Sequence, residues 1–136
     1  MPVTYRIDTT KRVIYTQCIG NVTLDEVYDH FRQLKRDPGC LERMDVLLDL
    51  SETASIPDSQ QIRDVSDQIG RIHQAVRFDA CAIVAVSDVL FGMSRMLEVF
   101  AEDWFRATHV CRARADAEAW LTSRSALINQ RSSEAV

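Results

Sequence analysis

The chain has 136 residues and a net charge of −4, with acidic and basic residues mixed along its length. A domain of this size buries a core without help from a metal or a disulfide, and the mixed charge argues against a nucleic-acid-binding protein, which would carry a basic stripe. No apolar run reaches the roughly 18 residues of a membrane span. The four cysteines form no C-x-x-C pair, and no signal segment precedes the first strand pattern, so we expect a cytoplasmic protein with reduced cysteines.

Two strands and a helix are predicted in the first 39 residues. Apolar and polar residues alternate over residues 3–7, and a second strand pattern covers residues 13–19. The polar break between them is so short that the two strands must be antiparallel. Thr23 and Glu26 then have the spacing of a capping box, which predicts the start of a helix. Its apolar stripe consists of Leu24, Val27, Phe31 and Leu34.

A second unit of strand and helix follows. Residues 44–50 form an apolar strand pattern, and residues 51–56 are expected to form a loop. Asp58 and Gln61 have capping-box spacing at the start of the next helix. The apolar stripe of this helix consists of Ile62, Val65, Ile69, Ile72 and Val76.

The stretch from residue 80 to 104 predicts the central strand and the helix after it. Residues 81–86 are continuously apolar, as in a strand covered on both faces, and Ser87 and Asp88 can cap a helix. The expected buried stripe of that helix consists of Val89, Met93, Met96, Phe100 and Trp104. Phe91 and Phe105 fall on the opposite, polar face with Arg95 and Glu98.

A short fifth strand at residues 109–111 and a last helix, with Ala117, Trp120 and Leu121 directed inward, complete the order β-β-α-β-α-β-α-β-α. This order predicts an α/β fold with a single open, mostly parallel five-stranded sheet, an antiparallel N-terminal edge strand and helices packed on the sheet. We expect one domain over residues 1–128 and a polar tail over 129–136.

Three stretches resemble SpoIIAA-like (STAS-like) domains, and in particular a bacterial branch of small uncharacterised proteins. They are the strand Val46-Leu-Leu-Asp-Leu-Ser51, the pair Asp58-Ser59 at a helix start, and Phe91-Gly-Met-Ser-Arg-Met96 followed by residues 117–121. The CRAL/TRIO lipid-binding domain shares part of this fold. In regulatory STAS proteins the serine at the helix start is phosphorylated by a partner kinase, so the resemblance implies Ser59 as a phosphorylation site. This chain departs from the family pattern after that serine, where it has Gln60-Gln61-Ile62 in place of Ser-Gly-Leu.

Ligands of open α/β sheets bind beyond the carboxyl ends of the strands. Polar residues collect at that edge, so we predict a ligand rim for a small polar molecule, although the same residue types also serve as ordinary loops and caps. The predicted rim consists of Asp49, Ser51, Asp58, Ser87, Asp88 and Arg112. The sequence has neither a nucleotide-binding glycine motif nor a P-loop, so no cofactor is expected.

No catalytic or metal-binding residues are predicted. His109 and Cys111 lie on one strand face, but His30 and His73 do not add ligands at a zinc-site spacing. No Gly-x-Ser-x-Gly motif is present, and Glu98 and Glu102 are better explained as a solvated helix face than as an acid-base pair.

Two functions remain open. The first is a non-enzymatic STAS-like regulatory domain that binds a protein partner or a second copy of itself through Phe91, Arg95 and Glu98. The alternative is a small-molecule or lipid-binding module, as the CRAL/TRIO resemblance implies. We expect little room for a large cavity in a chain of this length, and a deep apolar cavity between the helices that start near Pro57 and Asp88 would favour the alternative.

Overall fold

The computed structural model describes residues 2–40 and 43–134, and side chains as far as residue 126. Five strands form one sheet in the order β1-β2-β3-β4-β5. The strands are β1 (Val3–Asp8), β2 (Val13–Gly20), β3 (Met44–Thr53), β4 (Phe78–Val84) and β5 (Ala107–Cys111). β1 pairs with β2 antiparallel and the other neighbours are parallel. The predicted fold class is confirmed.

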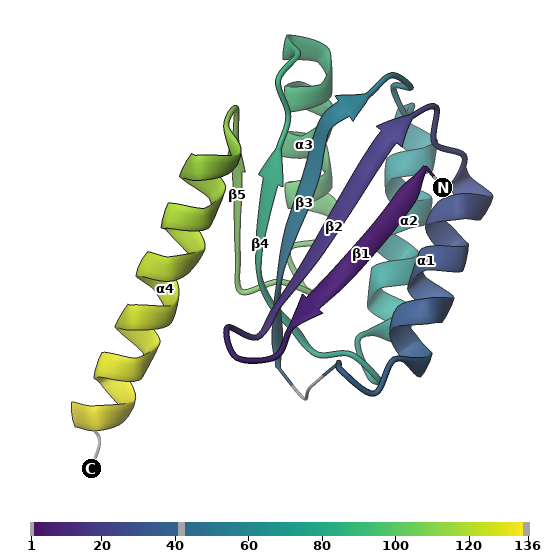
Figure 1. The fold of residues 1–136 in the computed structure, drawn as a ribbon. Helices are drawn as coiled ribbons and strands as arrows, with labels where there is room; N and C mark the ends of the chain where they lie inside the picture. Colours follow the sequence, from purple (N-terminus) through teal and green to yellow (C-terminus); the bar gives the residue numbers. More distant parts are fainter. Residues whose placement is uncertain (1, 41–42, 135–136) are drawn as a thin grey trace.

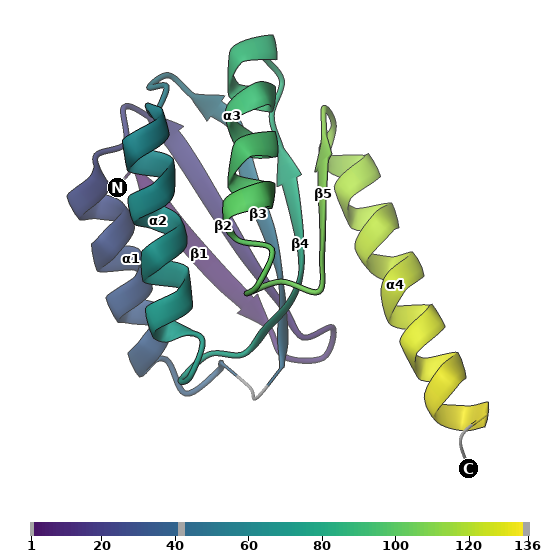
Figure 2. The same ribbon diagram turned by 180° about the vertical axis from the view of Figure 1, so that it is seen from behind.

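The four helices cover the sheet unequally (Figures 1 and 2). Their bounds are α1 (Leu24–Arg36), α2 (Ser59–Ile72), α3 (Asp88–Phe100) and α4 (Arg114–Glu134). Figure 2 shows α1, α2 and α3 in front of one face of the sheet, while α4 lies beside β5. The larger core cluster belongs to the three-helix face, and a smaller cluster joins Ala117 and Leu121 of α4 to the other face.

The first two helices begin where the capping residues predict. Thr23 accepts from the Glu26 N–H, and Glu26 Oε1 accepts from the Thr23 N–H, at 3.3 and 3.0 Å. Asp58 and Gln61 form the same reciprocal pair at 2.8 and 2.9 Å. Each pair satisfies amide groups that a helix start leaves without an intrahelical partner.

The predicted buried stripe of α3 is wrong by one position. The buried residues of this helix are Leu90, Ser94 and Leu97, while Val89 is 53% exposed. The other members of the predicted stripe, Met93, Met96, Phe100 and Trp104, are only partly buried at the margin of the core. Two candidate stripes lie about 100° apart on this helix. The predicted stripe is entirely apolar, whereas the observed buried stripe includes Ser94.

Ser94 is buried because its hydroxyl donates to the Leu90 carbonyl oxygen at 2.8 Å, which removes the cost of leaving it unpaired. Phe105 was expected on the polar face with Phe91, but it lies beyond the end of α3 and is 8% exposed. Its ring packs on Phe78, with ring centroids 5.4 Å apart.

The observed strands β3 and β5 are longer than predicted. β3 extends to Thr53, so the loop before α2 begins only after that residue, and β5 begins at Ala107. Helix α4 continues to Glu134, so the predicted division at residue 128 falls inside a helix, and the domain boundary stays a prediction.

Candidate functional site

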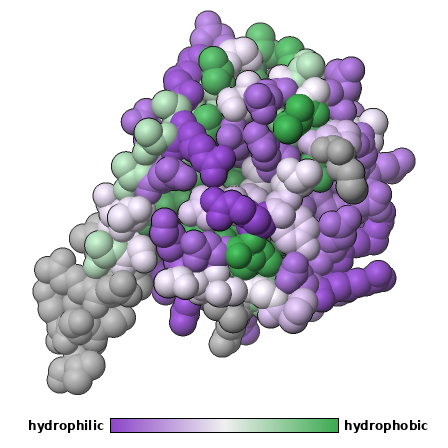
Figure 3. Space-filling model, in the orientation of Figure 1, coloured by the Kyte–Doolittle hydropathy of each residue, from purple (hydrophilic) through white to green (hydrophobic). Residues whose placement is uncertain are grey.

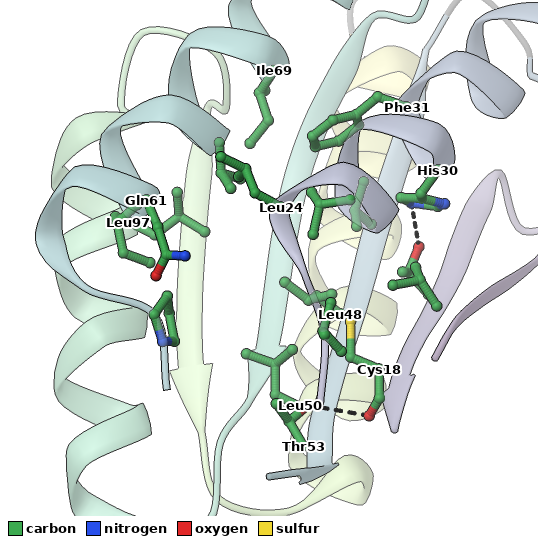
Figure 4. Close-up of a pocket in the computed structure, with 18 of the residues that line it drawn as sticks. Cys18, Leu24, His30, Phe31, Leu48, Leu50, Thr53, Gln61, Ile69 and Leu97 are labelled. Carbon is green, nitrogen blue, oxygen red and sulfur yellow. Dashed lines mark hydrogen bonds between the residues drawn. The ribbon is translucent and has the colours of Figure 1, made fainter. Parts of the chain in front are cut away.

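An apolar cavity of about 260 Å³ lies between α1, α2 and the three-helix face of the sheet. Strands β2 and β3 form its floor, and α3 contributes Leu90 and Leu97. Figure 4 shows Leu50 and Thr53 at one end, Phe31 and Ile69 at the other, and the Cys18 sulfur directed between them. This volume lies below the roughly 300–1,000 Å³ of typical ligand pockets, so the expectation of little room for a large cavity stays a prediction.

The floor of the cavity explains an unusual burial pattern in β3. Val46, Leu48 and Leu50 face the three helices, yet all three are only partly buried. Leu47, on the face covered by α4 alone, is fully buried. In a closely packed fold, the strand residues beneath three helices should be more buried than those beneath one helix. The partial burial of these three side chains therefore indicates that the cavity separates them from α1 and α2.

The exposed residues of the lining, Thr23 and Ile56, lie at the carboxyl edge of the parallel strands, so we place the mouth of the cavity there. The loop after β3 is joined there to the turn before α1. Ser55 Oγ accepts from the Val22 N–H at 2.9 Å, and the Ala54 N–H donates to the Gly20 carbonyl oxygen at 2.8 Å. Gly20 has a φ of 70°, a left-handed conformation that glycine adopts at little cost. These bonds hold the two loops together beside the opening.

The described residues that line the cavity carry no charge at neutral pH. His30 is the only basic side chain among them, and burial lowers its pKa to about 4. Its Nε2 lies 3.2 Å from Thr16 Oγ1 (Figure 4). Burial also raises the pKa of the Cys18 thiol to about 11 and that of Cys81 to about 12, so both stay protonated. The cavity therefore suits an uncharged occupant.

The sequence contains one weak signal of this cavity. Thr16 and Cys18 are consecutive inward positions of β2, beneath α1, and both are small. Small side chains at such positions leave space if the helix above does not approach the strand. The distance between helix and sheet depends on how all the elements pack together. The small residues Thr16 and Cys18 therefore do not predict the cavity from the sequence alone.

The residues of the predicted ligand rim separate into two clusters and one helix cap. Asp49 Oδ1 accepts from the Ser51 N–H and hydroxyl at 2.9 and 2.6 Å, and Asp49 Oδ2 lies 3.5 Å from Arg114. This cluster lies on the face opposite the cavity. Asp49 is 5% exposed, so its oxygens are satisfied mainly within the fold.

The second cluster centres on Arg112. Its guanidinium pairs with Asp88 at 2.9 Å, donates to the Val86 carbonyl oxygen at 2.6 Å and lies 4.3 Å from the Phe91 ring centroid. Ser87 caps α3 by accepting from the Leu90 N–H at 3.2 Å. The structure thus brings Ser87, Asp88 and Arg112 close together, and their role in ligand binding stays a prediction.

The other predicted sites lie on the surface of the helices. Asp58 is the N-cap of α2, and Ser59 is exposed as the first residue of that helix. Phosphorylation of Ser59 stays a prediction. In the predicted partner surface, Arg95 is exposed and pairs with Glu98 at 3.7 Å, whereas Phe91 is partly buried beneath Arg112.

A second, polar groove of about 830 Å³ lies between α4 and the β1–β2 hairpin. Lys11, Arg12 and Arg43 line it together with Asp45 and Glu118. Asp45 is 8% exposed and accepts from the Ala80 N–H at 3.1 Å. Burial raises the pKa of Asp45 despite that hydrogen bond.

Within residues 2–40 and 43–134, as far as side chains are described, no three His, Cys, Asp or Glu side chains are grouped so that they could hold a metal ion. The helices in the same part of the chain are all too short or too polar to cross a membrane.

Comparison with known proteins identifies the fold. No protein-family model matches the chain, and no curated protein matches it. Among solved structures, it is similar to an uncharacterised DUF3478-family protein with a SpoIIAA-like fold from Shewanella loihica PV-4. The chain has a SpoIIAA-like fold. The TM-score is 0.59 at 16% sequence identity, and the match covers 88% of this chain and 91% of the other. The SpoIIAA-like resemblance of the sequence is therefore confirmed for the fold.

Proposed function

We propose that this chain is a non-enzymatic SpoIIAA-like module that binds a small apolar molecule between α1, α2 and the sheet. The cavity carries this proposal, because an evolved core of this size is normally packed to the density of an organic crystal. A void left unfilled would cost stability in proportion to its volume. A bound apolar molecule would recover the lost contacts.

The dimensions support a ligand larger than a single small ring. A cavity of roughly 150 Å³ lined by aliphatic and aromatic side chains holds benzene, and this cavity measures about 260 Å³. It is also open at the carboxyl edge of the sheet, where α/β proteins commonly bind ligands. A ligand can therefore enter without unfolding of the domain.

A titration with N-phenyl-1-naphthylamine, an uncharged fluorophore whose emission rises in apolar surroundings, tests this proposal. We expect saturable binding to the wild-type chain. Val27→Phe places a ring into the cavity from α1 and should abolish the signal. Val99→Phe is the matched control, because Val99 is 61% exposed on α3 and outside the cavity.

Loss of binding in Val27→Phe with retention in Val99→Phe supports the proposal, provided that both variants keep the wild-type circular dichroism spectrum. Equal binding by both variants would place the probe elsewhere and overturn it. Cys18 gives a second measurement, since an occupied cavity should slow the reaction of its thiol with a disulfide reagent after mild denaturant is added.

A second candidate function is the binding of a protein partner beside the start of α3. Val86 and Val89 are 55% and 53% exposed, and Figure 3 shows apolar side chains along the upper edge of the molecule, where the strands end and α3 begins. Exposed apolar residues next to an ordered arginine are common in interfaces. On this basis the surface predicted at Phe91 would centre on Val86 and Val89.

A further inference from the structure

The mouth of the cavity holds one side-chain donor that the fold does not use. The hydroxyls of Thr23, Thr53 and Ser55 bond to Glu26, the Cys18 carbonyl oxygen and the Val22 carbonyl oxygen. Gln61 also lines the cavity, and among the described residues its Nε2 group has no hydrogen-bond partner.

The orientation of the Gln61 amide is fixed by the helix cap. Its Oε1 accepts from the Asp58 N–H at 2.9 Å, and only the oxygen of an amide can accept. The Nε2 group must therefore point away from the cap, and Figure 4 shows it directed into the cavity. A ligand atom there would meet a donor and no acceptor.

Charge excludes the usual anionic head groups. The described part of the lining contains neither lysine nor arginine, and the carboxylates of Glu26 and Asp58 cap the two helices on either side of the mouth. A carboxylate ligand would lose its hydration and meet negative charge without a cation to offset either cost.

The cavity beyond the mouth is elongated. Val46, Leu48 and Leu50 occupy successive inward positions of β3 along its floor, and four residues of extended strand span about 13 Å. The inner wall consists of Phe31, Ile69 and Phe78. Carbon centres of an extended hydrocarbon chain advance by about 1.3 Å each, and each end adds a van der Waals radius of about 2 Å, so a chain of roughly eight to ten carbons matches such a length.

We propose that the ligand is an uncharged single-chain molecule of about eight to ten carbons that ends in a carbonyl or hydroxyl oxygen, with a length set by the strand spacing. The chain lies on β3 between α1 and α2, and the oxygen accepts a hydrogen bond from Gln61 Nε2. This inference rests on the proposed function, since it names the class of molecule that the same cavity takes.

Displacement of N-phenyl-1-naphthylamine by three ligands of similar chain length tests the class at pH 7.5. We expect 2-nonanone to displace the probe about tenfold better than octanoate or octylammonium, since burial of either ion lacks an opposite charge. A series of methyl ketones from five to fifteen carbons should show an optimum near nine.

Gln61→Glu tests the hydrogen bond. Glutamate keeps an acceptor for the Asp58 N–H, so the helix cap survives, but it offers no donor to a ketone. We expect roughly three- to tenfold weaker binding of 2-nonanone, as for the loss of one hydrogen bond, with unchanged affinity for the probe. Gln60→Glu is the control, because it adds the same charge at an exposed position one residue away.

The outcomes separate this inference from the proposed function. If the probe does not bind the wild-type chain, both fail. If the probe binds but octanoate competes as well as 2-nonanone, or Gln61→Glu and Gln60→Glu respond equally, the ligand class is wrong and the apolar site remains.

Discussion

A Cβ atom on Gly70 would lie 2.5 Å from Cζ2 of the Trp104 indole, a distance that carbon atoms do not adopt. Helix α2 and the segment after α3 therefore approach each other at a point where only glycine fits. The same indole lies against His73, with ring centroids 5.8 Å apart. Trp104 therefore contacts both Gly70 and His73 at the C-terminal end of α2.

Gly70→Ala should lower the free energy of unfolding by about 1–2 kcal/mol, because overpacking outweighs the gain in helix propensity. Gly92→Ala is the control. A Cβ at Gly92, in α3, would meet no atom within 4 Å, so the substitution should raise stability by roughly 0.5–1 kcal/mol. Urea denaturation measures both, and stabilisation of equal size in the two variants would contradict the close contact.

His30 should make the protein less stable in mild acid. Burial lowers its native pKa to about 4, whereas the unfolded value is about 6.5. Between these pH values the unfolded state binds a proton at His30 that the folded state does not bind. The stabilisation due to neutral His30 is therefore complete above pH 6.5 and is lost as the pH falls toward 4. At about pH 4 the free energy of unfolding should be lower by roughly 3 kcal/mol than at neutral pH.

His30→Gln removes the titrating group and should flatten this part of the profile. The comparison is the difference in unfolding free energy between wild type and variant at pH 7.5, 6.5, 5.5 and 4.5, since other groups contribute equally to both. A difference that stays constant over this range would show that His30 is not buried as the neutral imidazole.

Asp79 and Asp88 each pair with an arginine at similar distance but different burial. Asp79 is 3% exposed and lies 2.8 Å from Arg43, while Asp88 is 93% exposed and lies 2.9 Å from Arg112. We expect Asp79→Asn to cost about 1–3 kcal/mol, because the two oxygens of Asp79 face Arg43 and Arg106, so either orientation of the amide directs a donor at a cation. Asp88→Asn should cost about 0.5 kcal/mol or less. Equal losses in thermal unfolding would argue against the difference in burial.

Self-association through the start of α3 can be measured by size-exclusion chromatography with light scattering. If Val86 and Val89 join two copies, the wild-type chain elutes as a dimer and Val89→Asp shifts it toward the monomer. Phe91→Ala should act more weakly, because Phe91 is partly covered by Arg112. Val99→Asp, at another exposed position of α3, should leave the dimer intact. A wild-type monomer at every concentration would contradict self-association.

The order of elements was determined by local sequence. Capping pairs at Thr23 and Asp58, the apolar run of β4 and the alternation of β1 each fix a small piece of backbone through contacts within a few residues. The rules of chain connection then leave few arrangements for such an order. The α/β fold with its mostly parallel sheet was therefore predictable from the element order, while its SpoIIAA-like character was implied by the family resemblance.

The tertiary structure decided which face of each element meets the core and where space remains. Whether Val89 or Leu90 turns inward depends on how α3 packs against α2, and Ser94 can be buried only because its hydroxyl reaches Leu90. The cavity beside Thr16 and Cys18 likewise depends on the distance between helices and sheet. Such distances arise from the packing of residues far apart in the chain. The strand predicted at residues 81–86, which the structure places at 78–84, and the helix after it were therefore found from sequence, while the cavity was not.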